Sequence, residues 1–185
     1  MTEHLPRADW TQPASLAQLV EALGAEDLRW VGGCVRDTLL GYPANDIDAA
    51  TRHLPATVID RCRSAGIRTV PTGIDHGTVT AILEDGPVEI TTLRRDVATD
   101  GRRATIAFSE DWRDDAARRD FTIHALYAHP ETPAIDDYFG GLHDLSPHLV
   151  RFICDSATRV IASPFPILPS LLLPTLFGRD SHAQA

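Results

Sequence analysis

Lysine is missing from this sequence of 185 residues, so all 17 basic residues are arginines. Its absence excludes Schiff-base chemistry and a phosphate loop of the Gly-Lys-Ser/Thr type. Cysteine is scarce, because Cys34, Cys62 and Cys154 are scattered and form no Cys-x-x-Cys pair. The sequence therefore predicts neither a disulfide framework nor a zinc site. Scattered thiols and an N-terminus without a secretory pattern favour a cytoplasmic location.

Positive charge is also in short supply, because 26 acidic residues outnumber the arginines and give a formal net charge of -9. This balance argues against a broad basic clamp for nucleic acid but leaves room for a local arginine site. A hydrophobic content of 43% with 23% charged residues is typical of a globular chain with a real core. The uncharged stretch 161–177 contains four prolines, so we expect no membrane span and no membrane partner.

Hydrophobic periodicity predicts a mixed α and β chain whose strands are partly antiparallel. The expected helices and strands of the first half are, in order, a helix Ser15–Leu23, a strand Leu28–Val31, a helix Val35–Leu40, a strand around Ile47, a helix from Pro55 to Gly66, and strands Ile67–Val70, Thr78–Leu83 and Val88–Leu93. In the second half, the sequence predicts a charged loop Arg94–Arg103, a helix from about Ser109 through Ala128, and a strand Leu149–Ile153.

Two aspartates in the strand around Ile47 are candidate metal ligands. Alternate side chains of a strand share a face, so Asp46 and Asp48 would project together and offer oxygen ligands to a divalent cation. Glu89, in another predicted strand, would complete a trio of carboxylates. The competing interpretation is a solvated turn, because 19 aspartates produce such pairs by chance.

Glycine and arginine supply a candidate phosphate site. Gly32 and Gly33 follow a predicted strand and open a helix, where backbone N–H groups converge and favour an anion, although a tight turn is the commoner explanation. Arg36 lies one turn later and either reaches the same anion or pairs with its neighbour Asp37. The adjacent pair Arg118 and Arg119 needs anionic partners, which structural aspartates or a bound triphosphate would supply.

Five segments in order resemble one family, the head of the bacterial-type tRNA nucleotidyltransferases (CCA-adding enzymes) and their poly(A) polymerase relatives. The segments are Val31–Gly41 (VGGCVRDTLLG), Asn45–Asp48 (NDID), Val88–Thr92 (VEITT), Arg118–Ala125 (RRDFTIHA) and Asp137–Leu142 (DYFGGL). The resemblance covers roughly residues 25–159.

The resemblance implies a polymerase-β-like nucleotidyltransferase fold, a mixed and largely antiparallel sheet flanked by helices. It assigns Asp46, Asp48 and Glu89 to two Mg²⁺ ions and to catalysis. It assigns nucleotide binding to five residues, Gly32, Gly33, Arg36, Arg119 and Asp120, of which the last two would hold the phosphates and sense the ribose 2′-hydroxyl. The implied reaction adds nucleotides from ATP or CTP to the 3′ end of an RNA, expected to be tRNA.

The resemblance also implies three segments: an N-terminal helical extension over residues 1–24, the nucleotidyltransferase head over 25–155, and a truncated, aberrant and poorly ordered neck segment over 156–185. In this last segment, Ser163, Pro164 and Ile167 stand where the family has the Glu-Asp-x-x-Arg group that selects the base. His124 replaces a family Asn, and Cys154 replaces a glycine.

Two alternatives to an active enzyme therefore stay open. One is a non-catalytic fragment that keeps Mg–NTP binding but lacks base selection and RNA grip, and the other is a structural or partner-binding protein. The sequence leaves the product, CCA or poly(A), and the oligomeric state undecided.

Overall fold

The structure is a computed structural model, and it describes residues 4–44, 46–100, 103–145 and 149–153. These residues belong to one unit of the chain, Met1–Cys154; the other unit, Asp155–Ala185, lies outside the described residues. The expectations for the tail, including its truncated neck segment, therefore lie outside them as well. Within the described part, no helix combines the length and the apolar character that crossing a membrane requires.

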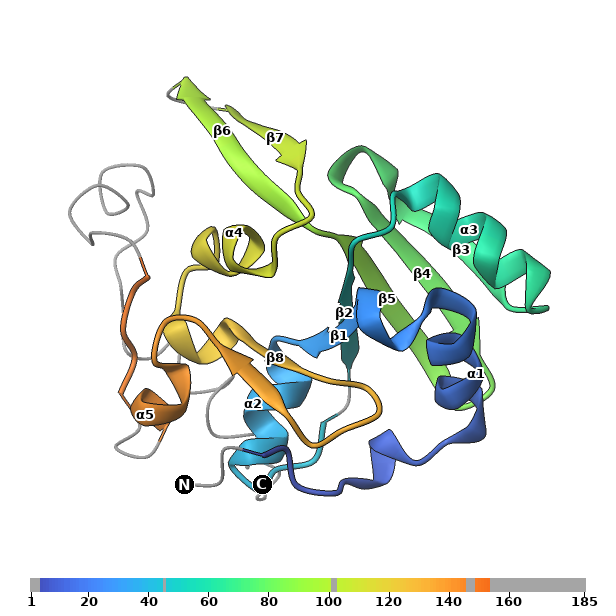
Figure 1. The fold of residues 1–185 in the computed structure, drawn as a ribbon, viewed down its shortest axis with the longest axis horizontal. Coiled ribbons are helices and arrows are strands. Elements are labelled where there is room, and N and C mark those ends of the chain that lie inside the picture. Colours follow the sequence, from blue (N-terminus) through green and yellow to red (C-terminus); the bar gives the residue numbers. More distant parts are fainter. Residues whose placement is uncertain (1–3, 45, 101–102, 146–148, 154–185) are drawn as a thin grey trace, which may run out of the picture. The chain divides into compact units, whose positions relative to one another are not determined.

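A mixed sheet forms the framework of the described residues (Figure 1). Its seven strands lie in the order β3-β4-β5-β2-β1-β8-β9, in which β2 and β5 are parallel and every other neighbouring pair is antiparallel. The strands are β1 (Leu28–Val31), β2 (Ile47–Thr51), β3 (Arg68–Gly73), β4 (Thr78–Leu83), β5 (Gly86–Thr92), β8 (Leu126–Ala128) and β9 (Ile135–Asp137). This arrangement confirms the predicted mixed, largely antiparallel sheet.

Five α-helices are described, and they lie against the sheet or its ends (Figure 1). They are α1 (Ala14–Leu23), α2 (Gly33–Leu39), α3 (Pro55–Ser64), α4 (Trp112–Ala117) and α5 (Gly141–Leu145). Helix α1 buries Leu16, Leu19, Val20 and Leu23, which recur at helical spacing. Helix α3 begins at a proline, whose fixed φ suits a first helical turn.

The two faces of the sheet are covered differently. Helices α1 and α3 pack together, and α3 contacts β3 and β4; the alternate residues Val79 and Ala81 of β4 are buried, as is Ile90 of β5, the register partner of Val79. Helix α4 covers the opposite face, because its Trp112 packs in one buried cluster with Ala50 of β2. Strand alternation places Asp48, two residues before Ala50, on this second face.

The second half of the chain corrects three sequence-based predictions. The predicted charged loop Arg94–Arg103 is wrong, because β6 (Arg94–Asp100) and β7 (Arg103–Phe108) form an antiparallel hairpin. The predicted helix from Ser109 through Ala128 is also wrong beyond Ala117, since a short 3-10 helix over Thr122–His124 and strand β8 follow.

The predicted strand Leu149–Ile153 makes only an isolated bridge, between Phe152 and Phe121. In the segment after α4, tertiary pairing overrides the local pattern, because backbone groups bond wherever packing places a partner.

Candidate active site

Two carboxylates meet on neighbouring parallel strands. Asp48 of β2 and Glu89 of β5 are direct register partners, so their side chains project from the same face of the sheet. Asp48 is half-buried, whereas Glu89 and Asp46, the latter just before β2, are exposed. The structure therefore brings together two of the three predicted acids as register partners and places the third at the start of the same strand.

The surroundings of Asp48 disfavour its charged form and raise its pKa. Burial, the Glu89 carboxylate and the Asp46 carboxylate raise the pKa of Asp48 to about 6, although Arg119 acts in the opposite direction. Crowded acids of this kind are stabilised by a positive partner, and a hard divalent cation prefers oxygen ligands. The face around Asp48 therefore favours a cation.

The carboxylates of the site fit an Mg²⁺ ion that also binds substrate and water, and they do not form a metal site made of protein ligands alone. In residues 4–44, 46–100, 103–145 and 149–153, no three histidine, cysteine or acidic side chains lie close enough together to hold a metal ion by themselves. Mg²⁺ is usually bound by only one or two carboxylates together with substrate phosphates and waters. Asp48 and Glu89 supply that minimum, and a triphosphate would supply the remaining oxygens.

A glycine turn lies directly beside Asp48. Gly32 connects β1 to α2 with φ +79°, a left-handed conformation that side chains disfavour. A side-chain carbon at Gly32 would lie 3.5 Å from Asp48 Oδ2 and 3.9 Å from Arg119 Nη1, so both groups face this turn. Gly33 begins α2, which has only seven residues. Anion binding here would therefore rely mainly on arginine.

Arg119 faces the same place from the chain that follows α4. The prediction that Arg118 and Arg119 lie in the middle of a helix is wrong, because α4 ends at Ala117. Both arginines bind the buried carboxylate of Asp115, with Arg118 Nε 2.8 Å from Oδ1 and Arg119 Nη2 3.5 Å from Oδ2. Arg119 Nε also donates to the Tyr127 hydroxyl at 3.1 Å. A structural aspartate therefore serves both arginines and leaves Arg119 aimed at Gly32.

Arg36 is buried, and its guanidinium already has protein partners. Its Nη2 lies 2.7 Å from Asp37 Oδ1, and its Nη1 bonds to Nε2 of His124. Burial, Arg36 and Arg119 lower the pKa of His124 to about 4, so its ring is neutral at pH 7 and accepts this bond. The sequence left two partners open for Arg36, an anion or Asp37, and the structure shows the pairing with Asp37. A contact between Arg36 and phosphate stays a prediction.

Asp120 lies at the edge of this region, with an exposed side chain. Its backbone is fixed by the segment that follows α5, because the N–H of Ile153 donates to the Asp120 carbonyl at 3.2 Å and the N–H of Thr122 donates to the Arg151 carbonyl at 3.0 Å. The role of Asp120 toward a ribose stays a prediction.

Sequence reasoning did not identify Asp115 or Tyr127. The signal for Asp115 is its spacing, three and four residues before Arg118 and Arg119, which places side chains together on a helix. No local pattern points to Tyr127, because it reaches Arg119 through the pairing of β8 with β1.

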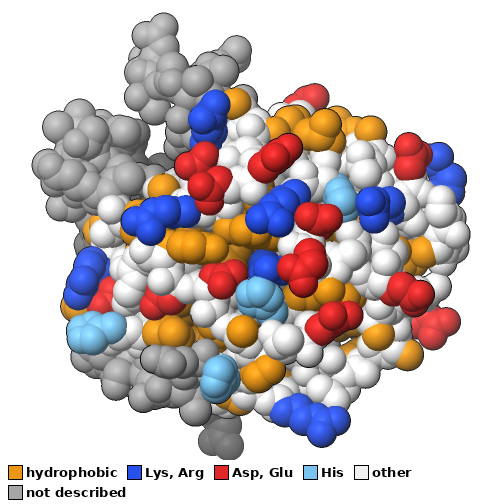
Figure 2. All heavy atoms as spheres, viewed as in Figure 1, with side chains coloured by type: hydrophobic (Ala, Val, Ile, Leu, Met, Phe, Trp, Pro, Cys, Tyr) orange, Lys and Arg blue, Asp and Glu red, His pale blue; other side chains and the backbone are white. Residues whose placement is uncertain are grey.

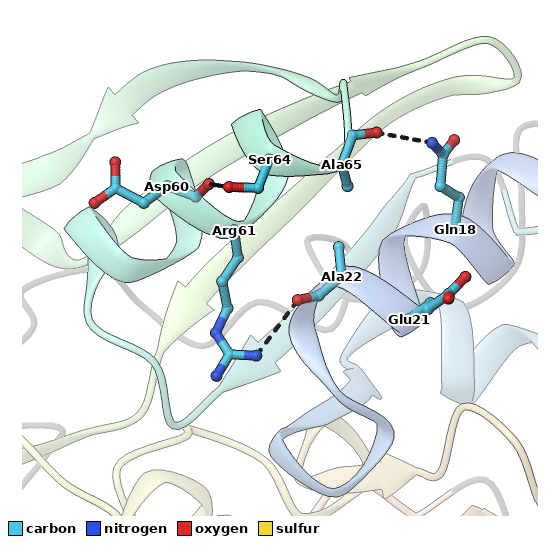
Figure 3. Close-up of a pocket in the computed structure, with 7 residues that line it drawn as sticks. All are labelled: Gln18, Glu21, Ala22, Asp60, Arg61, Ser64 and Ala65. Atoms are coloured by element: carbon cyan, nitrogen blue, oxygen red, sulfur yellow. Dashed lines mark hydrogen bonds between the residues drawn. The ribbon is translucent and has the colours of Figure 1, made fainter.

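A groove of about 530 Å³ lies between α1 and α3, on the face of the sheet opposite Asp48 (Figure 3). Gln18 donates to the Ala65 carbonyl at its upper end, and Arg61 donates to the Ala22 carbonyl across it. These bonds tie the two helices together, so the groove marks their seam and contains none of the candidate site residues.

Comparisons with known proteins show the family of this chain. The model of the Poly A polymerase head domain matches residues 28–151. The mitochondrial CCA tRNA nucleotidyltransferase 1 of Homo sapiens is 44% identical over 135 residues, which are 72% of this chain and 31% of the relative. The CCA-adding enzyme of Limosilactobacillus fermentum is 40% identical over 159 residues, which are 85% of this chain and 38% of the relative.

Solved structures lead to the same group. The CCA-adding enzyme of Bacillus stearothermophilus in complex with CTP matches with a TM-score of 0.68 and 27% identity, over 83% of this chain and 37% of that one. A tRNA nucleotidyltransferase complexed with a primer tRNA and an incoming ATP analog matches with a TM-score of 0.60 and 28% identity, over 80% of this chain and 41% of that one. This chain spans about a third of the length of the relatives it matches. The chain belongs to the family described as the Poly A polymerase head domain.

Proposed function

We propose that this chain is a nucleotidyltransferase head that binds Mg–NTP and adds nucleotides to the 3′ end of an RNA, with tRNA as the expected acceptor. One observation carries the proposal. Asp48 and Glu89 are register partners on one sheet face, and Asp48 faces the same glycine turn as Arg119. Two carboxylates that favour a bound cation therefore lie beside Arg119, whose guanidinium suits phosphate oxygens.

The acidic residues of the site would bind the metal ion, and its arginines would bind the phosphates. Asp46, Asp48 and Glu89 would hold Mg²⁺. Arg119 would bind the phosphates next to the Gly32 turn, and Gly33, Arg36 and Asp120 keep the nucleotide-binding roles that the family resemblance implies. When bound, Mg²⁺ would favour the ionised RNA 3′-hydroxyl and offset the charge of the departing pyrophosphate.

The proposed reaction breaks one bond and forms another. The RNA 3′-oxygen attacks the α-phosphorus of the NTP, and the bond between that phosphorus and the bridging oxygen of pyrophosphate breaks. Positioning and charge stabilisation supply most of the rate enhancement in such transfers. The matched structures support the substrate classes, since one relative is bound to CTP and another to a primer tRNA and an incoming ATP analog.

A second candidate function is Mg–NTP binding without efficient transfer to RNA. It is favoured by the formal net charge of -9 and by the face shown in Figure 2, where arginines and acids are interspersed. RNA affinity depends strongly on cationic contacts to phosphate. The base-selecting group expected near Ser163 and Ile167 is also replaced in the sequence.

One assay separates the candidates. The purified chain is incubated with Mg²⁺, labelled CTP or ATP, and tRNA lacking its 3′-terminal nucleotides. Asp48→Asn and Glu89→Gln keep the size of the side chains but remove their charge, and Glu84→Gln, in the exposed turn between β4 and β5, is the matched control.

Incorporation that is lost in both site variants and kept in the control supports the proposed enzyme. Mg–NTP binding without incorporation supports the second candidate. Absence of Mg–NTP binding overturns both.

We also propose a cytoplasmic location from the cysteine pattern. Relatives described as mitochondrial belong to the same family, so fractionation of cells that express the chain is the test.

A further inference from the structure

Arg119 presents two different edges to its surroundings. Its Nε donates to the Tyr127 hydroxyl at 3.1 Å, and its Nη2 lies 3.5 Å from Asp115 Oδ2. Its Nη1 points the other way, toward the Gly32 turn and the side of Asp48. Because a guanidinium is a rigid planar fork, fixing the Nε edge fixes the direction of Nη1.

Tyr127 determines the direction of this contact. Its side chain is fully buried, and its hydroxyl donates to Asp115 Oδ2 at 2.6 Å. A phenol has a single proton, so a hydroxyl that donates to Asp115 can only accept from Arg119. The two hydrogen bonds that link Arg119 to Tyr127 and Tyr127 to Asp115 therefore have only one possible direction of donation.

Asp115 is the buried end of this hydrogen-bond network. It is only 1% exposed, and besides Tyr127 it accepts bonds from Arg118 Nε at 2.8 Å and from the backbone N–H of Arg94 at 3.2 Å. Burial would raise the pKa of Asp115, but Arg119 and Arg118 lower it below its usual range. The carboxylate is therefore a fixed negative charge beneath both arginines.

A purely structural role would not require this geometry. The Asp115 charge is already met by Arg118 and by the Arg94 N–H, so Arg119 is a further cation brought to the same buried acid. Arg119 is held on one edge and aimed with the other at the turn beside Asp48, where the proposed function places a triphosphate.

We infer that Tyr127 and Asp115 are positioning residues that hold the Arg119 guanidinium in the direction needed to bind the phosphates of an incoming NTP. This inference rests on the proposed function and deepens it, because it names how the phosphate-binding arginine is aimed. Neither residue touches the substrate itself.

The first test measures equilibrium binding of Mg–CTP and of CMP to the full chain. Tyr127→Phe removes only the hydroxyl and keeps the ring packing against Trp112 and Tyr138. We expect Mg–CTP affinity to fall about tenfold, the scale of one charge-assisted hydrogen bond, and CMP affinity to change by less than about threefold. Tyr42→Phe, at an exposed tyrosine, is the matched control.

A second test is a double-mutant cycle with Arg119→Ala. If Tyr127 acts through Arg119, Tyr127→Phe adds less than about twofold once the arginine is gone. Losses that multiply in the double variant, or equal losses for Mg–CTP and CMP, overturn the inference.

Folding and function are kept apart by two readouts. A misfolded fraction lowers the stoichiometry of binding and the near-ultraviolet circular dichroism signal, but it leaves the dissociation constant of the folded molecules unchanged. Asp115→Asn is a second variant for which we expect the same preferential loss of Mg–CTP.

If the wild-type chain binds no Mg–CTP, the proposed function fails and this inference fails with it. If the wild-type chain binds Mg–CTP and Tyr127→Phe binds it equally well, only this inference fails.

Discussion

At the scale of single residues, opposite charges meet beside one glycine turn. Asp48 is disfavoured as an anion by burial and by Glu89 and Asp46, which raise its pKa to about 6. Arg119 is brought toward it although Asp115 already provides that arginine with a partner. Such an arrangement stabilises the fold less than a neutral packing would, and it becomes favourable when a cation and a polyanion bind.

His124 offers a residue-scale prediction about pH. Its pKa is lowered from 6.5 to about 4 by burial, Arg36 and Arg119, so the unfolded chain binds the proton more readily. The stability that neutral His124 contributes is therefore complete above pH 6.5 and is lost as the pH falls toward 4. We expect His124→Asn to lack this part of the decline when the free energy of unfolding is measured by urea titration between pH 4 and 7.

Other titrating groups, among them Asp48, act in both proteins and cancel in the difference between the two curves. His76→Asn, at an exposed histidine, is the matched control. Parallel curves for the wild-type chain and His124→Asn would contradict the prediction.

The sequence indicates the residues of the candidate site better than it indicates their supports. Asp48, Glu89 and Gly32 are indicated by the motifs that carry the family resemblance, whereas their local patterns alone also fit a solvated turn and a tight turn. Tyr127 has none, since only the pairing of β8 with β1 carries its hydroxyl to Arg119. The Arg36–His124 bond joins residues 88 positions apart and is equally invisible to local patterns.

At the scale of elements, the region after α4 is held by buried polar bonds instead of a continuous helix. Asp137 accepts four backbone N–H groups, from Phe139 to Leu142, and so fixes the start of α5. Asp144 of α5 is fully buried, and it accepts from the Thr122 hydroxyl at 2.7 Å and from Arg151 Nη2 at 3.0 Å. These bonds join α5, the 3-10 helix and residues 149–153.

Asp144→Ala tests this linkage. The change leaves the Thr122 hydroxyl without its partner and Arg151 without its counter-ion, so we expect the free energy of unfolding to fall by about 3 kcal/mol. Urea denaturation with linear extrapolation measures it. Asp60→Ala, which removes an exposed pair with Arg63, is the control and is expected to change stability by less than about 1 kcal/mol. Equal losses in the two variants would show that the buried linkage contributes nothing special.

Pairing in the region after α4 explains why the predicted helix through Ala128 is wrong. The apolar residues near Ile123 and Leu126 have helical spacing, yet Phe121 pairs with Phe152 and Leu126 pairs with Asp137 in the structure. Elements whose partners are close in sequence, such as the β4–β5 hairpin and α1, match the prediction. Local periodicity fails for β8, whose partner β1 is distant, and it also fails for the β6–β7 hairpin, because its charged first strand lacks a clear apolar alternation.

At the scale of the whole molecule, the linear order of five motifs carried more information than composition did. Acidic composition argues only against a broad basic clamp for nucleic acid, whereas the order and spacing of glycine, aspartate and arginine motifs indicate the family that the comparisons show. The sheet then brings Gly32, Asp48 and Glu89 to one face through strand order β5-β2-β1. The predicted division of the chain at residues 24 and 155 stays a prediction.

The charge of the molecule leads to a prediction about RNA. The net charge is -9, and several arginines of the described residues already have acidic partners: Arg29, Arg36, Arg52, Arg63, Arg118, Arg119 and Arg151. Each neutralised phosphate contributes about -0.9 to the slope of log affinity against log salt concentration on duplex nucleic acid. We therefore expect weak tRNA binding with a slope no steeper than about -3, corresponding to roughly three contacts.

Fluorescence anisotropy with labelled tRNA between about 50 and 200 mM salt measures this slope. Arg68→Ala, at an exposed arginine of β3, shows whether a single surface cation shifts the slope by about one unit. A slope of about -7 or steeper in the wild-type chain would mean that a cationic surface grips the RNA after all. Mg–NTP affinity measured over the same salt range should change less, because the triphosphate would be held at a compact, partly buried site where screening is weaker.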